Sequence, residues 1–199
     1  MNRLFSLSVS LLLLLTPVLA MGEAAEYTDG NFTFSCPAGW SVMTLEAIDE
    51  LVATAEKDGN EMYKLVLEGT RAQMEELGMI IVTSDDMISS INIIPQDAGA
   101  EVTNEMLAAM KDGVIEELTA SVADISFPAE PAMLDLADGR QALLVQYSMP
   151  LFDDYALLGS RAYAGVGNTL FVIEVTSEPD RAEADAEALS LVLSSLRAN

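Results

Sequence analysis

Two pairs of adjacent aspartates, Asp85-Asp86 and Asp153-Asp154, lie in stretches that the sequence predicts to be loops. Carboxylate oxygens are the ligands that hard divalent cations prefer, and two facing carboxyl groups can act as acid and base on a sugar or peptide bond. A calcium loop supplies six or more ligands at ordered spacing, which neither pair has. Aspartate is also common in turns, so solvated turn residues are the favoured interpretation. A divalent-cation site and a carboxylate-based hydrolase stay open as alternatives.

The second pair lies within a short segment that also carries apolar and aromatic side chains. Its residues are Leu151, Phe152, Asp153, Asp154 and Tyr155. An aromatic anchor surrounded by charge is a common feature of protein interfaces. Packing on the edge of a sheet is the simpler interpretation of the apolar side chains. These five residues are the candidate contact with a partner.

The residues that catalysis most often uses are missing from the chain. It contains no histidine, which excludes histidine acid–base catalysis, the usual serine or cysteine triads and most zinc or copper sites. No glycine-rich phosphate loop, Cys-x-x-Cys pair or Gly-x-Ser-x-Gly elbow occurs. The single cysteine, Cys36, shares a predicted strand face with two phenylalanines, so we expect a small buried hydrophobe. We expect no catalytic residue, metal or cofactor, and hence no enzyme.

The formal net charge of −23, from 32 acidic and 9 basic residues, limits the classes of partner. Nucleic acids and anionic membranes attract positively charged surfaces, so neither is expected to bind. A solvated, self-repelling surface is the simplest interpretation of this acidity. A basic protein partner or bound divalent cations are the more specific ones.

The first twenty residues have the three parts of a secretory signal. Arg3 supplies the positive start, residues 4–15 form an apolar run, and small residues precede a cleavage site after Ala20. Cleavage after Ala24 or Ala25 is a second choice, and an uncleaved anchor is disfavoured because the run is short for a span. The sequence therefore predicts a signal peptide (1–20), a leader (21–29) and a single domain (30–199). The mature protein is expected to be secreted or extracytoplasmic, without stable insertion in a membrane.

The domain is expected to begin with a strand that places Phe32, Phe34 and Cys36 on its buried face. Pro37 ends this strand, and Trp40 turns back towards the core. Apolar spacing and end signals then predict two helices, over 45–57 with Thr44 as N-cap and over 61–77 with Gly78 after its end.

The remaining elements follow from β-branched runs, turn residues and helical periodicity. A long helix capped by Thr103 is predicted to run to Ala120, a tight type I′ turn at Asp138-Gly139, a hairpin at Gly167-Asn168, and a capping box over 177–180 before a final helix. This helix is expected to bury Leu189, Val192, Leu193 and Leu196. Strands are predicted over 79–83, 90–94 (ended by Pro95), 125–127, 133–136, 140–149, 155–165 and 169–176, with a loop over 150–154.

Together these elements predict an α+β domain, in which a mostly antiparallel sheet of about six strands has helices on both faces. The motif Pro37-Ala38-Gly39-Trp40 after a short strand, and an apolar hairpin strand followed by a closing helix, resemble the PsbP-like superfamily. This superfamily includes an extrinsic photosystem protein and a eukaryotic nuclear-import factor. The resemblance implies an α/β/α sandwich that acts by surface contact with another protein, and it brings no catalytic residues. The inserted helical pair and the acidity of this chain depart from the pattern, so metal or photosystem contacts do not carry over.

The sequence thus favours a secreted, non-enzymatic bacterial protein that binds another extracytoplasmic protein or assists assembly. A carboxylate-based hydrolase or a divalent-cation-binding protein is the alternative.

Overall fold

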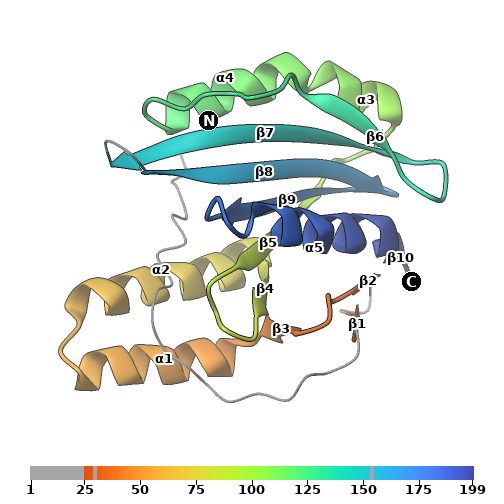
Figure 1. Ribbon diagram of the computed structural model, residues 1–199. Helices are drawn as coiled ribbons and strands as arrows, with labels where there is room; N and C mark the ends of the chain where they lie inside the picture. Colours follow the sequence, from red (N-terminus) through yellow and green to blue (C-terminus); the bar gives the residue numbers. More distant parts are fainter. Residues whose placement is uncertain (1–24, 29–30, 153–154) are drawn as a thin grey trace.

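The computed structural model describes residues 25–28, 31–152 and 155–199 of the chain. Its main element is a seven-stranded antiparallel sheet with the strand order β3-β4-β5-β9-β8-β7-β6 (Figure 1). The strands are β3 (Trp40–Met43), β4 (Ile80–Ser84), β5 (Ser90–Asp97), β6 (Ala132–Asp135), β7 (Gln141–Phe152), β8 (Tyr155–Val166) and β9 (Thr169–Ser177). The predicted signal peptide lies outside the described residues.

A separate three-stranded sheet has the order β1-β2-β10, from β1 (Glu26–Thr28), β2 (Phe32–Ser35) and β10 (Arg197–Ala198). The sequence predicted the strand at Phe32 but did not predict this second sheet. The chain changes sheet after Pro37, where Gly39 adopts a φ of 75° that suits glycine, and Trp40 then opens β3. Phe32, Phe34 and Cys36 are buried as predicted, and Trp40 is half-buried against the same core.

The first two helices begin and end where the sequence predicted them, α1 at Leu45–Lys57 and α2 at Glu61–Leu77. Residues at the helix ends explain these bounds. The side chain of Thr44 accepts a hydrogen bond from the Ala47 N–H at 3.1 Å, and Gly78 ends α2 in the left-handed conformation.

The predicted helix over 103–120 is two helices, α3 (Asn104–Ala109) and α4 (Lys111–Ser121). The break comes at Met110, whose N–H bonds the carbonyls of both Met106 and Leu107 and so tightens the turn. Leu107 of α3 and Leu118 of α4 both reach one core cluster on the sheet.

The final helix, α5 (Ala182–Ser195), buries Leu189, Val192, Leu193 and Leu196 as predicted, but the predicted capping box is wrong. The N-cap is Arg181, which makes no side-chain cap bond, because residues 179–181 form a turn before the helix.

Helices cover both faces of the main sheet, as the sequence predicted. Helix α5 and β2 share one core cluster with the inner side chains of β4, β5 and β9. On the other face, α3 and α4 pack on β7, β8 and β9, while α1 and α2 pack on β3 and β4. The fold is therefore α+β, with an antiparallel sheet between helical layers (Figure 1).

Three turn and strand predictions need correction. Strand β5 does not end at Pro95, which pairs with Phe171 of β9. Because β4 pairs with β5 only as far as Ile93, β9 is the sole neighbouring strand at Pro95, and a residue without an N–H is tolerated there. The predicted strand over 125–127 is only an isolated bridge between Ser126 and Ser148.

The turn at Asp138-Gly139 is not type I′, since of these two residues only Gly139 has a positive φ. Its N–H bonds the Leu136 carbonyl at 3.0 Å, which makes a four-residue turn ending in a left-handed glycine. The hairpin at Gly167-Asn168 joins β8 and β9 as predicted.

Candidate functional site

The segment predicted to contact a partner lies at the end of the β7–β8 hairpin. The loop was predicted to begin at Pro150, and this start is wrong, because β7 continues to Phe152, which pairs with Tyr155 at the start of β8. Asp153 and Asp154 lie outside the described residues. Tyr155 is 37% exposed. Desolvation, and then the carboxylate of Glu178, raise the pKa of its phenol. A partner contact at Leu151 to Tyr155 stays a prediction.

The other acidic pair, Asp85-Asp86, lies in the turn between β4 and β5. The Asp86 carboxylate accepts hydrogen bonds from the Ser84 hydroxyl at 2.6 Å, the Ile88 N–H at 3.1 Å and the Arg181 guanidinium at 2.6 Å. Desolvation alone would raise the pKa of Asp86, but these hydrogen bonds outweigh it and hold the pKa below its ordinary value. The three hydrogen bonds of the Asp86 carboxylate therefore stabilise the conformation of the turn. Within the described ranges, no group of three or more acidic, cysteine or histidine side chains is placed to hold a metal.

The start of α5 holds the same turn through a second contact. The Ser89 hydroxyl donates to the carboxylate of Asp185 at 2.9 Å, and Asp185 is only 1% exposed. Asp185 of α5 and Arg181, the N-cap of that helix, therefore both bond to the turn. They reach it from the face of the sheet opposite α1.

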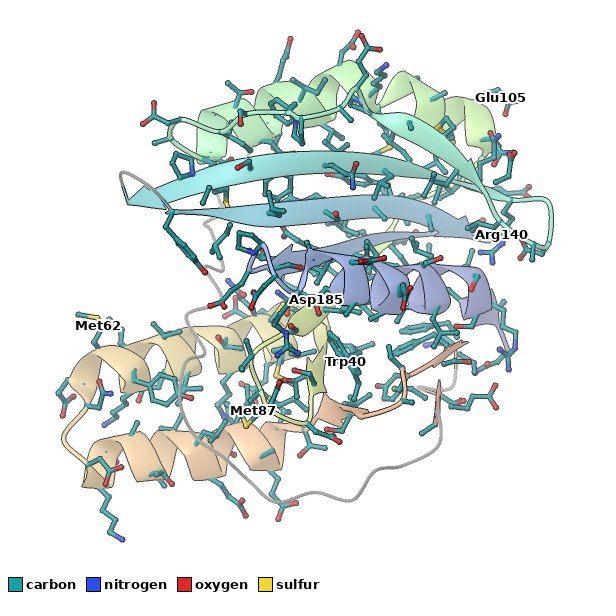
Figure 2. The ribbon with its side chains drawn as sticks, viewed as in Figure 1. Trp40, Met62, Met87, Glu105, Arg140 and Asp185 are labelled. Carbon is teal, nitrogen blue, oxygen red and sulfur yellow. The ribbon has the colours of Figure 1, made fainter. Side chains whose placement is uncertain are left out.

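Met87 occupies this turn in a strained backbone conformation. Its φ is 58°, which is uncommon for a residue with a long side chain. Such strain costs about 1–3 kcal/mol and persists where surrounding contacts impose it. Here the contacts of Asp86 and Ser89 impose it, and Figure 2 shows Met87 close to α1 and Asp185 at the start of α5.

Beside Met87 lies a groove of about 320 Å³ between α1 and the end of strands β3 and β4. We call it the Met87 groove. The residues that matter for its chemistry are four apolar ones and two acidic ones, namely Met43, Ala47, Leu51, Met87, Glu50 and Asp85. Neither Glu50 nor Asp85 forms an ion pair with any residue that the structure describes. The groove thus combines apolar walls with two carboxylates that have no cationic partner in the described part of the chain.

Comparison with known proteins then places the fold. No family model matches the chain, and no curated protein matches it in sequence. The solution structure of cyanobacterial PsbP from Synechocystis matches 93% of this chain and 99% of its own, with a TM-score of 0.51 and 12% sequence identity. The chain has a PsbP-like fold. A structure of LpqN, described as involved in cell envelope biogenesis of Mycobacterium tuberculosis, matches 89% of this chain and 91% of its own, with a TM-score of 0.48 and 8% identity.

Within this PsbP-like fold, Cys36 is a buried hydrophobe and not a reactive thiol. The residue is 3% exposed, and burial raises the pKa of its thiol, so that little reactive thiolate forms.

Sequence reasoning found one side of the Met87 groove and missed the other. It identified Asp85 as a turn residue and α1 as a helix, but not that α1 brings Glu50 to the same groove. This meeting depends on how α1 packs on β3 and β4, which local spacing does not specify. Glu50 is exposed and only Leu51, its neighbour in the chain, is half-buried, so the sequence carried little signal that Glu50 would line the groove.

The lining of the groove suits an elongated side chain. Lysine and arginine carry an apolar stem and a cationic head, which match apolar walls and a carboxylate respectively. No helix within the described residues has the length and apolar content needed to cross a membrane.

Proposed function

We propose that this chain is an extracytoplasmic, non-enzymatic protein that binds a basic segment of another protein in the Met87 groove. The observation that carries the proposal is the presence of Glu50 and Asp85, without cationic partners in the described residues, on the apolar groove. The strained Met87 turn, held by Asp86 and Ser89, keeps the groove formed before a partner arrives. A preformed site binds more tightly, since less ordering accompanies association.

The charge of the molecule favours a basic partner. With a net charge of −23, long-range attraction speeds the approach of a positive segment and slows that of a negative one. At the groove, a lysine stem would contact Met43, Leu51 and Met87 while its ammonium lies between Glu50 and Asp85. Lysine therefore fits the groove better than a purely apolar residue.

Two observations support a role without catalysis. The chain has no histidine. The local environment also lowers, and does not raise, the pKa of Asp86 and Asp138, whereas a carboxylic acid that donates a proton near neutral pH needs a raised pKa. The extracytoplasmic location is supported by the signal-like residues 1–20.

A matched pair of peptides tests the occupant of the groove. One is acetyl-Gly-Leu-Lys-Leu-Gly-amide, and the other replaces lysine by norleucine, which keeps the stem and removes the charge. We expect calorimetry to show about tenfold weaker binding of the norleucine peptide. The double substitution Glu50→Gln and Asp85→Asn should abolish this preference.

The control substitution is Glu76→Gln with Glu116→Gln, because it changes the net charge equally at two exposed sites away from the groove. It should leave the preference for lysine intact. Equal binding of the two peptides, or equal effects of the two double substitutions, would refute the proposed occupant.

The wider role is tested with proteins from the extracytoplasmic fraction of the producing cells. Immobilised protein should retain a partner that the Glu50→Gln/Asp85→Asn protein does not retain and the control protein does. If the groove substitutions leave retention unchanged, the partner binds to another surface. The Leu151 to Tyr155 segment would then be substituted next. A rise in melting temperature with added calcium that is lost in the groove variant would instead favour the cation-binding alternative.

A further inference from the structure

Strand β3 forms one end of the main sheet, so among the described residues it pairs with a strand on one side only, with β4 (Figure 1). In an antiparallel pair, the N–H and C=O of successive residues point alternately towards the partner strand and away from it. The hydrogen bond from the Asp85 N–H to the Gly39 carbonyl, at 2.8 Å, fixes this alternation for β3. Ser41 and Met43 therefore direct their N–H and C=O towards β4.

The backbones of Trp40 and Val42 point the other way, away from β4. The Trp40 N–H donates to the carbonyl of Pro37 at 3.1 Å, just before the strand. In the part of the chain that the structure describes, no backbone group bonds the Trp40 C=O or the N–H and C=O of Val42. We call these three groups the β3 edge. Ser41 is exposed and Val42 is half-buried, so solvent reaches this part of the strand.

The β3 edge runs beside the Met87 groove. The groove lining includes three residues of β3 and the two carboxylates described above, namely Ser41, Val42, Met43, Glu50 and Asp85. Side chains along a strand alternate between its faces, so Ser41 and Met43 share the face of the groove, whereas Val42 packs on the core beneath α5. A strand added to the β3 edge would therefore direct every second side chain onto the groove face.

We propose that the basic partner of the Met87 groove binds as an extended segment that adds an antiparallel strand to the β3 edge, with its lysine opposite Ser41. This inference rests on the function proposed above and specifies the conformation and register of the partner. In such an arrangement backbone hydrogen bonds supply affinity, and sites for alternate side chains supply specificity. The antiparallel direction matches the pairing of β3 with β4 and is slightly more stable than the parallel one.

The register follows from the alternation along β3. With lysine opposite Ser41, the residue before lysine exchanges two hydrogen bonds with Val42, and the residue after it donates one to the Trp40 carbonyl. The backbone N–H of lysine points away from β3. Its side chain crosses the small side chain of Ser41 towards Asp85. Met43, the other β3 residue on this face, is buried and leaves less room for a lysine stem.

The charge of the groove favours this occupant over a second copy of the chain. In a dimer joined through two β3 edges, Glu50 and Asp85 of both copies would lie close together, and like charges repel. A second β3, Trp40–Met43, also offers no lysine. The strand has only four residues, and short edge strands limit unwanted pairing, so the β3 edge suits a short segment with a matching charge.

Three singly N-methylated forms of acetyl-Gly-Leu-Lys-Leu-Gly-amide test the register. A methyl group on the backbone nitrogen of either leucine removes a hydrogen bond to the β3 edge, so we expect calorimetry to show about tenfold weaker binding or more. The same methyl group on the backbone nitrogen of lysine points away from β3 and should change the affinity less than about twofold. Equal effects at the three positions, or a loss confined to the lysine position, would overturn the proposal.

The same peptides separate this inference from the function proposed above. If lysine is preferred to norleucine but the position of the methyl group makes no difference, the groove binds the lysine side chain and the added strand is refuted. If the lysine and norleucine peptides bind equally, the occupant of the groove is wrong and the inference fails with it.

Hydrogen exchange at the Val42 amide gives a second measurement in the unsubstituted protein. A saturating amount of the lysine peptide should slow this exchange about tenfold or more, because the amide gains an acceptor. The Met43 amide, which already points towards β4, should change less. Unchanged exchange at Val42 would contradict the added strand. Protection of Val42 without peptide that increases with protein concentration would assign the β3 edge to a second copy and would also refute the proposal.

Discussion

Tyr147 and Gly159 face one another across β7 and β8, and the ring of Tyr147 fills the space that a side chain at 159 would take. A Cβ at position 159 would lie 2.1 Å from carbons of that ring. The ring cannot move freely, because Tyr147 is 2% exposed and its hydroxyl is bonded to Glu174. Burial, and then the Glu174 carboxylate, raise the pKa of this phenol, so it stays protonated and remains a donor.

We therefore expect Gly159→Ala to lower the free energy of unfolding by about 1–3 kcal/mol, the usual cost of overpacking a core. Urea unfolding followed by circular dichroism measures this change. A variant as stable as the original protein would show that the Tyr147 ring has another position open to it.

At Gly113 we expect alanine to stabilise the protein, in contrast to Gly159. Because a Cβ there meets no atom within 4 Å and the residue lies inside α4, Gly113→Ala should raise the free energy of unfolding by up to about 1 kcal/mol. The same urea experiment applies, with Gly159→Ala as the contrasting substitution. Loss of stability in Gly113→Ala would mean that α4 approaches the sheet more closely at this point.

At the scale of elements, the turn between β4 and β5 depends on one ionised carboxylate. The pKa of Asp86 is held below its ordinary value of about 3.9, so its contribution to stability is complete above that pH and is lost as the pH falls through the lower, folded-state pKa. Below about pH 4 we expect the bonds to Ile88 and Arg181 to weaken, and hydrogen exchange at the Ile88 amide to rise relative to amides in β9.

The control for this prediction is Asp86→Asn, which keeps the size of the side chain and removes its titration. Its Ile88 amide should exchange faster than that of the original protein at neutral pH and should show little further change on acidification. Acid sensitivity that persists unchanged in Asp86→Asn would assign it to another carboxylate.

Element by element, the sequence predicted best what local forces decide. Helices α1 and α2 were predicted to the residue because apolar spacing, Thr44 and Gly78 act within a few positions of the chain. Pro95 was misjudged because its place inside β5 depends on where β4 ends, which is a matter of pairing. The small sheet was missed because β10 is too short to recognise from its own two residues.

In the candidate site, too, the sequence identified the residues that local signals mark and missed those that only contacts between distant segments place. Asp85 and Asp86 were identified from turn composition, and the structure places both in a turn. The roles of Arg181 and Asp185, which reach this turn from the start of α5, and the position of Glu50 on the groove depend on contacts between distant segments. A single sequence carries no signal for such contacts.

At the scale of the whole molecule, the charge imbalance should govern the response to salt. With 32 acidic and 9 basic residues, repulsion between like charges outweighs the weak exposed ion pairs. Salt screens both the repulsion and the ion pairs, and the repulsion is the larger of the two. Raising sodium chloride from about 20 mM to about 500 mM should therefore raise the melting temperature by a few degrees. Differential scanning calorimetry at constant pH measures this, and a fall in melting temperature would show that the ion pairs dominate.

The pairing of β10 with β2 has a consequence for the newly made chain. Arg197 and Ala198 pair with Thr33 and Phe32, and the Thr33 hydroxyl contacts Asn199, 166 residues away along the chain. Since ribosomes synthesise proteins from the amino end, β2 can pair with β1 early, but its other edge at Phe32 and Thr33 stays unpaired until residues 197–199 have been made. A chaperone that shields Phe32 during this interval would favour correct folding, and the emergence of residues 197–199 from the ribosome would mark the moment when the three-stranded sheet can close.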